Sequence, residues 1–183
     1  MNERPATPPD PVAEPSEYQA MVLGFLDGLD VVEAYEALPA RLHALVEQAG
    51  DRLRVRPSEG EWSVLEVLGH IVDGEVATAA RLRWVLAEDE PPLPGYDQDR
   101  WVERQRHNEA DPEMLLALLT ALRRSNQALW EAASDVERAR VGLHAERGPE
   151  SFELLFRLAA GHGLLRLEQM QRTVEAARAS RMR

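Results

Sequence analysis

Residues 61–75, EWSVLEVLGHIVDGE, contain a clear helix start and place a histidine inside an apolar run. Ser63 and Glu66 match the S-x-x-E capping box, in which each side chain accepts a hydrogen bond from a backbone N–H at a helix N-terminus. Apolar residues then recur at helical spacing as far as Leu86. We therefore predict a helix over residues 64–87 that carries His70.

Three more segments show the same periodicity. Residues 31–50, VVEAYEALPARLHALVEQAG, form the first, in which Pro39 either starts the regular helix or kinks it. Asp111-Pro112, an N-cap residue followed by proline at the first helical position, begins a helix that extends to about residue 133. Ser151 caps the last helix, which reaches about residue 178, and residues 96–107 favour one short helical turn.

Four amphipathic helices predict an all-α fold, an antiparallel four-helix bundle. No strand-like alternation longer than a few residues is present between them. Five prolines in residues 1–16 indicate a flexible tail with no core-forming pattern. We expect residues 1–22 to form this tail and the start of an N-terminal arm, residues 23–178 to form the bundle, and residues 179–183 to form a C-terminal tail.

Charge and composition exclude several classes of function. The formal net charge of −11 argues against binding to nucleic acid or to an anionic membrane through phosphates. The absence of cysteine excludes disulfides, thiolate zinc sites and cysteine nucleophiles. No apolar run approaches the roughly 20 residues of a membrane span, and the N-terminus lacks the pattern of a signal peptide. We expect a cytoplasmic protein.

A second histidine lies in residues 158–170, LAAGHGLLRLEQM, where Gly161 and Gly163 flank His162. At about 100° per residue, Arg166 and Gln169 lie about 40° and 20° from His162 around the helix. A mid-helix glycine costs about 1 kcal/mol relative to alanine, so these glycines require a reason. They either leave open volume or let two helices approach closely.

The His70 helix presents a matching polar face. Glu66 and Asp73 lie about 40° and 60° from His70 on the same side of the helix, and Gly69 and Gly74 are nearby. Two histidines on separate helices, both beside glycine, predict a shared site. His43, His107 and His144 are interpreted as ordinary exposed or satisfied histidines, and Trp62 and Trp130 as core residues.

These motifs resemble the DinB/YfiT-like superfamily. EWSVLEVLGHIVDGE is similar to its G-W-S-x-x-E-x-L-x-H-L-x-D-x-E block, and residues 148–170, GPESFELLFRLAAGHGLLRLEQM, are similar to its closing block with H-D-x-x-H-x-x-Q. LDGLD, residues 26–30, before LPARLHAL, residues 38–45, matches its usual opening. The resemblance covers about residues 23–178 and implies a four-helix bundle, often a homodimer.

The resemblance also implies a nickel or zinc ion held by three histidines. His70 matches the first ligand and His162 the second, but the third position is Arg166, and Gly163 replaces the family's aspartate. A guanidinium has no lone pair to give and carries a positive charge. Either Glu66 or Asp73 completes a metal site with the two histidines, or Arg166 replaces the charge of the metal and pairs with one of these acids. We favour the second arrangement.

Three functions remain open. The first is a DinB-like stress or detoxification protein with a degenerate metal site, which binds a small anionic or thiol ligand near Arg166. The second is an active metal-dependent thiol S-transferase or hydrolase, for which any thiol must come from the cosubstrate. The third is a non-catalytic dimeric scaffold. A homodimer is also favoured by the apolar arm, whose side chains need a surface to cover them: Met21, Val22, Leu23, Phe25 and Leu26.

Overall fold

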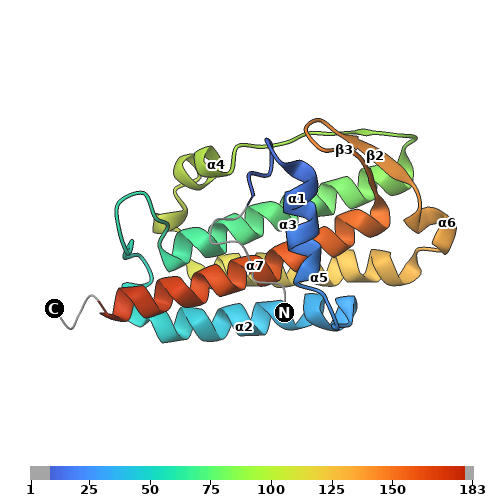
Figure 1. The fold of residues 1–183 in the computed structure, drawn as a ribbon. Coiled ribbons are helices and arrows are strands. Elements are labelled where there is room, and N and C mark those ends of the chain that lie inside the picture. Colours follow the sequence, from blue (N-terminus) through green and yellow to red (C-terminus); the bar gives the residue numbers. More distant parts are fainter. Residues whose placement is uncertain (1–8, 180–183) are drawn as a thin grey trace.

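The computed structural model describes residues 9–179, in which four long helices lie side by side (Figure 1). These helices are α2 (Val31–Ala49), α3 (Val64–Ala87), α5 (Pro112–Ala132) and α7 (Phe152–Ala179). All four predicted helices are confirmed, and their ends lie within one residue of the expected positions. The predicted short turn is also confirmed, as α4 (Gln98–Arg104).

The predicted caps are present at the helix starts. The Ser63 hydroxyl accepts a hydrogen bond from the Glu66 N–H at 3.2 Å, and the Glu66 carboxylate accepts one from the Ser63 N–H at 2.8 Å. The Asp111 carboxylate accepts from the Glu113 N–H, and the Ser151 hydroxyl accepts from the Leu154 N–H, each at 3.0 Å. These bonds satisfy N–H groups that have no partner within their own helix.

Pro39 lies inside α2 and does not begin it. Proline has no N–H to donate to the carbonyl four residues earlier, which here belongs to Tyr35. The Arg123 guanidinium of α5 donates a hydrogen bond from Nη1 to that carbonyl at 2.5 Å. A tertiary contact therefore replaces the helical bond that Pro39 removes.

The directions of the four helices differ from those of a simple antiparallel bundle. α7 packs against α2 and α3, and α5 packs against the same two helices. Figure 1 shows that α3 and α5 run in one direction, whereas α2 and α7 run in the other. The antiparallel prediction is therefore wrong for the neighbouring pairs α3/α5 and α2/α7. The physical reason is the long connection over residues 88–111, which returns along the bundle before α5 begins.

The connections contain a small sheet that the sequence analysis did not expect. β1 (Pro92–Leu93) pairs in parallel with β2 (Val141–His144), which pairs antiparallel with β3 (Gly148–Ser151). Strands of two to four residues are too short to show a period of two. The remaining connections hold α6 (Asp135–Arg138) and two 3₁₀ turns, η1 (Gly50–Arg52) and η2 (His107–Glu109).

The N-terminal arm is a helix, α1 (Pro15–Gly24), that crosses α7 (Figure 1). Its Val22 side chain and the following Phe25 and Leu26 are buried within the same chain. The argument that this arm needs a partner subunit to cover it is therefore wrong. Of the two expected tails, residues 1–8 and 180–183 lie outside the described part of the chain.

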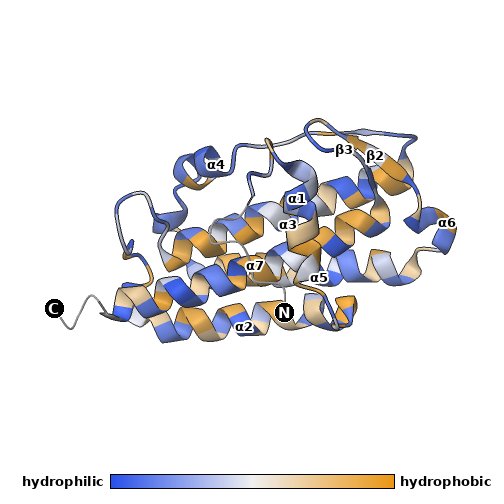
Figure 2. Cartoon of the chain, viewed as in Figure 1, coloured by the Kyte–Doolittle hydropathy of each residue, from blue (hydrophilic) through white to orange (hydrophobic). Residues whose placement is uncertain are grey.

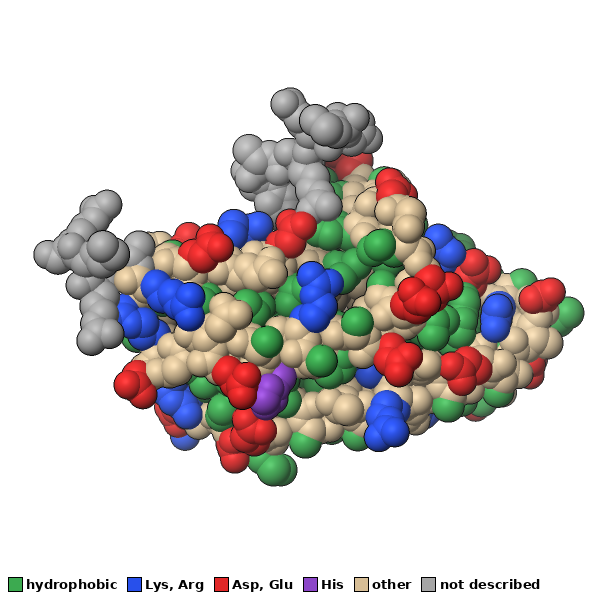
Figure 3. Space-filling view, turned by 90° about the horizontal axis from the view of Figure 1, so that it is seen from below, with side chains coloured by type: hydrophobic (Ala, Val, Ile, Leu, Met, Phe, Trp, Pro, Cys, Tyr) green, Lys and Arg blue, Asp and Glu red, His purple; other side chains and the backbone are tan. Residues whose placement is uncertain are grey.

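The core lies between the four long helices, along which hydrophobic residues alternate with hydrophilic ones (Figure 2). Trp130 stacks on Phe156 with ring centroids 4.5 Å apart, which confirms the interpretation of Trp130 as a core residue. Across residues 9–179, none of the helices combines the length and the apolar character needed to cross a membrane. On the face seen from below, acidic and basic side chains are interspersed (Figure 3).

Candidate functional site

The structure brings the two glycine-flanked histidines together across the interface of α3 and α7. The Nε2 atoms of His70 and His162 are 3.2 Å apart, and the two rings meet at an angle of 74°. Residues nearly a hundred positions apart in the sequence thus share one site. The two histidines meet because α3 and α7 pack against each other.

Arg166 lies directly against this pair. Its Nε donates a hydrogen bond to His162 Nε2 at 3.2 Å, and Nη1 donates to the Gln169 side chain at 2.7 Å. Nη2 donates to the Gln98 side chain of α4 at 3.1 Å. The guanidinium lies 5.6 Å from the centre of the Trp62 ring, which also packs against His70. Trp62 is therefore part of the site and not simply a core residue.

The donors around His162 determine where its proton lies. A guanidinium only donates hydrogen bonds, so His162 Nε2 must be the acceptor and the ring proton is on Nδ1. His70 Nε2 faces the same lone pair, so it carries the His70 proton. His70 Nδ1 is then an acceptor, and it is buried without a hydrogen-bond partner among the described residues.

Both histidines are neutral at pH 7. Burial and, after it, the charge of the Arg166 guanidinium together lower the pKa of His162 to about 3. Burial, followed by the charge of Arg166, also lowers the pKa of His70 well below its usual value. The site therefore consists of two uncharged imidazoles beside one permanent positive charge, that of Arg166.

Glu66 and Asp73, which the sequence placed near His70, are committed to other partners. Glu66 forms an ion pair with Arg56, and Asp73 accepts hydrogen bonds from His107 at 2.7 Å and Gln105 at 3.1 Å. Neither carboxylate forms an ion pair with Arg166 in residues 9–179. The expectation that Arg166 pairs with one of them is therefore wrong, because nearer cations and donors satisfy both acids.

These residues do not fit the three-ligand metal site that the family resemblance implies. The lone pair of His162 Nε2 accepts from Arg166, and the third ligand position offers only donors. In the described part of the chain, no group of three or more His, Asp or Glu side chains is placed to hold a metal ion. The spacing of the two Nε2 atoms suits two ligands of one ion, but the rest of the ligand set is absent there.

The four glycines near the histidines serve different purposes. A Cβ atom on Gly69 would collide with the His107 ring, one on Gly161 with the Val22 carbonyl of α1, and one on Gly163 with the Leu38 side chain at 2.5 Å. These three permit close packing. Gly74 is different, because a Cβ atom there would lie 3.5 Å or more from every neighbour.

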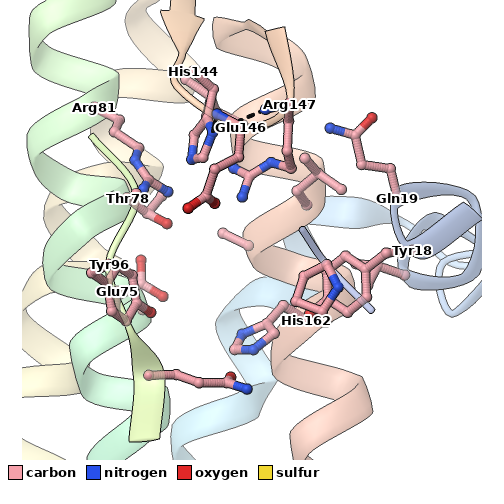
Figure 4. Close-up of a pocket in the computed structure, with 18 of the residues that line it drawn as sticks. Tyr18, Gln19, Glu75, Thr78, Arg81, Tyr96, His144, Glu146, Arg147 and His162 are labelled. Carbon is pink, nitrogen blue, oxygen red and sulfur yellow. Dashed lines mark hydrogen bonds between the residues drawn. The ribbon is translucent and has the colours of Figure 1, made fainter. Parts of the chain in front are cut away.

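Gly74 borders a cavity of about 560 Å³ that also reaches His70 and His162. Figure 4 shows Tyr96 and Arg81 on one side of this cavity, His162 on α7, and Tyr18 on α1. Arg166 lies outside it and lines a second hollow with Trp62 and Gln169. Tyr18 borders both spaces. The cavity next to the histidines therefore adjoins the hollow next to Arg166, and Gln98 also borders both.

A buried charge pair, which sequence analysis missed, forms part of the cavity wall. Glu75 of α3 accepts a hydrogen bond from Arg123 Nε of α5 at 3.0 Å, and both side chains are 3% exposed. Tyr35 and Asn126 also donate to the Glu75 carboxylate. The only signal in the sequence for this pair was a charged residue, Glu75, at a core-facing position of a predicted helix. Tyr96, in an irregular connection, gave none.

Comparison with known proteins supports the resemblance to the DinB/YfiT-like superfamily. The family model described as the DinB superfamily matches residues 3–170. "Putative metal-dependent hydrolase YfiT" of Bacillus subtilis (strain 168) is 30% identical over 116 residues, which span 63% of this chain and 65% of that protein. "Putative metal-dependent hydrolase OB0782" of Oceanobacillus iheyensis is 26% identical over 72% of this chain and 77% of that protein.

The fold comparison agrees. A solved structure described as "YfiT from Bacillus subtilis is a probable metal-dependent hydrolase with an unusual four-helix bundle topology" is similar, with a TM-score of 0.74 and 26% identity. The similarity covers 82% of this chain and 85% of that structure. The family model matches most of this chain, and the chain shares its fold with the YfiT structure. This chain therefore belongs to the DinB superfamily.

Proposed function

We propose that this protein is a DinB-superfamily member of the stress or detoxification type with a degenerate metal site, in which Arg166 stands in place of a bound cation. It binds a small anionic or thiol ligand in the cavity bordered by His70 and His162. The observation that carries the proposal is the hydrogen bond from Arg166 Nε to His162 Nε2. That bond occupies the lone pair a metal would need and places a permanent positive charge beside it.

The metal content of the protein, purified without a histidine tag, tests this proposal. We expect less than stoichiometric nickel and zinc, and weak binding when either metal is added. Arg166→His removes the positive charge and adds a lone-pair donor on the same helical face. This variant should gain stability with added metal, about 2.7 kcal/mol at a metal concentration 100 times the dissociation constant.

Arg157→His is the matched control, because it places a histidine on the same helix at an exposed position that lines neither the cavity nor the hollow beside Arg166. It should show no metal-dependent gain, and His70→Ala in the Arg166→His background should abolish the gain. The gain should also fade at low pH, once the ligating histidines protonate, and burial places that point below the usual histidine range for His70 and His162. Tight binding of one metal per wild-type chain, or no gain in Arg166→His, would refute the proposal.

An active metal-dependent thiol S-transferase or hydrolase is the second candidate. It is favoured by the 3.2 Å spacing of the two Nε2 atoms and by the names of the relatives. Stoichiometric metal in the wild type would select it, with a rearranged Glu66 or Asp73 as the third ligand. A thermal-shift screen with low-molecular-weight thiols and carboxylates separates both candidates from a non-catalytic scaffold.

A further inference from the structure

The space over Gly74 is bordered by two groups that can donate hydrogen bonds. An ideal Cβ atom on Gly74 would lie 3.5 Å from the Tyr96 hydroxyl oxygen and 3.7 Å from His162 Nδ1. The Tyr96 and His162 side chains come from opposite sides of the cavity (Figure 4). A glycine at this position of α3 therefore keeps open a notch that any larger side chain would fill.

Both groups are available to a ligand as donors. The hydrogen bond from Arg166 places the His162 proton on Nδ1, on the ring edge that faces Gly74. Neither His162 Nδ1 nor the Tyr96 hydroxyl makes a hydrogen bond to another group within residues 9–179. Burial raises the pKa of Tyr96 to about 12, so its hydroxyl keeps its proton at pH 7.

The charged groups that act on His162 favour an anion beside its ring. The charged groups that act on His162 are all arginines, namely Arg166, Arg123 and Arg147. Among charged groups, Arg81 has the largest effect on Tyr96, and the Asp73 carboxylate acts in the opposite direction. The charge acting on His162 is therefore positive, although the wider cavity lining also includes the carboxylates of Glu75 and Glu146 and the whole chain has a formal net charge of −11.

We propose that a carboxylate group of the ligand binds over Gly74, with one oxygen accepting a hydrogen bond from His162 Nδ1–H and the other from the Tyr96 hydroxyl. The two oxygens of one carboxylate allow a single group to reach both donors. Arg166 acts as a positioning residue, because it sets the His162 tautomer without lining the cavity. This inference rests on the proposed function and names the ligand class as a small carboxylic acid in its ionised form.

The His162 tautomer can be measured before any ligand is added. Long-range proton–nitrogen NMR correlation of the imidazole ring should show the proton on Nδ1 in the wild-type protein at pH 7. Addition of benzoate should shift the His162 Nδ1 signal, and benzamide, the uncharged analogue, should shift it far less. A proton on Nε2, or no response to benzoate, would overturn the inference.

Two substitutions test the notch itself. Gly74→Ala places a methyl group in the notch at ordinary contact distances, so benzoate should bind at least about tenfold more weakly. The melting temperature should not fall, because alanine favours a helix more than glycine does. Tyr96→Phe should also weaken benzoate binding about tenfold with little change in melting temperature, because its hydroxyl has no hydrogen-bond partner in the described chain.

Gly24→Ala is the matched control, since nothing lies within 4 Å of its Cβ position and Gly24 does not line the cavity. It should bind benzoate as the wild type does. Equal benzoate affinity for Gly74→Ala and the wild type would overturn the inference. The metal content of the wild type decides the proposed function separately, so failure of one can be told from failure of the other.

Discussion

At the scale of single residues, the site is defined by which partner each polar side chain finds. Arg166 donates to His162, Asp73 accepts from His107, and Glu66 pairs with Arg56. Each of these interactions occupies a side chain that helical spacing would otherwise make available as a metal ligand. The same principle applies to buried groups elsewhere in the cavity wall, where two predictions can be made.

His144 of β2 should make stability depend on pH. Burial lowers its pKa to about 4, with the Arg147 charge acting in the same direction. The unfolded histidine titrates near 6.5, so between these values the unfolded state binds more protons, and the free energy of unfolding falls as pH falls from about 6.5 to about 4. Urea denaturation at several pH values should show that the free energy of unfolding depends less on pH in His144→Gln than in the wild type. The difference should correspond to the uptake of at most one proton on unfolding. Identical slopes would contradict the assigned pKa.

Arg123→Met should strongly destabilise the fold. It leaves the buried Glu75 carboxylate without its cation and the Tyr35 carbonyl without the donor that compensates for Pro39. Loss of one partner of a buried pair costs about 3–5 kcal/mol. Urea denaturation measures the loss, and Arg172→Met, at an exposed ion pair, should cost less than about 1 kcal/mol. Equal effects of the two variants would show that the buried pair has no special role.

At the scale of elements, glycine decides how closely helices approach. Gly161 of α7 lets the Val22 carbonyl of α1 come so near that a Cβ atom would overlap it. This contact holds α1 across α7, where Tyr18 borders both the histidine cavity and the hollow beside Arg166. The position of α1 thus depends on a residue whose helical propensity is poor.

Gly161→Ala should destabilise the protein, although alanine is the better helix former. Overlap with backbone that cannot rotate away costs about 1–3 kcal/mol, which exceeds the gain of about 1 kcal/mol in propensity. Hydrogen exchange should show faster exchange in α1 than in the wild type. The control Gly24→Ala should not lower stability, since its Cβ position is open. Slower exchange in α1 of Gly161→Ala would show that the overlap is relieved without loss.

At the scale of the whole molecule, assembly remains a prediction from the family resemblance. The arm offered as an interface is buried within its own chain, through Val22, Phe25 and Leu26. We still propose a homodimer, and light scattering at tens of micromolar, a concentration typical of weak interfaces, should give twice the mass of one chain. The mass of a single chain under those conditions would refute it.

The surface charge predicts that nucleic acid does not bind. With a formal net charge of −11 and basic residues interspersed with acidic ones on the face in Figure 3, a phosphate backbone would meet net repulsion. A mobility-shift assay at physiological salt should show no complex with duplex DNA. A complex that weakens steeply as salt is added would contradict this prediction.

The sequence by itself determined the elements of the fold, because helix signals are local. The capping box at Ser63, the Asp111-Pro112 start and the apolar stripes identified all four long helices. Helical spacing also placed Arg166 and Gln169 beside His162, since residues three and four apart share a face. The family resemblance also implies that His70 and His162 belong to one site, and their Nε2 atoms are 3.2 Å apart.

Only the tertiary structure decided what depends on residues distant in the chain. The direction of α5 followed from the course of the connection over residues 88–111, and the strands were too short to show alternation. Asp73 and Glu66 turned to His107 and Arg56, which no local pattern could indicate. Gly74 and Gly69 look equivalent in the sequence, yet one borders an open notch and the other contacts a histidine ring, because packing across helices sets that difference.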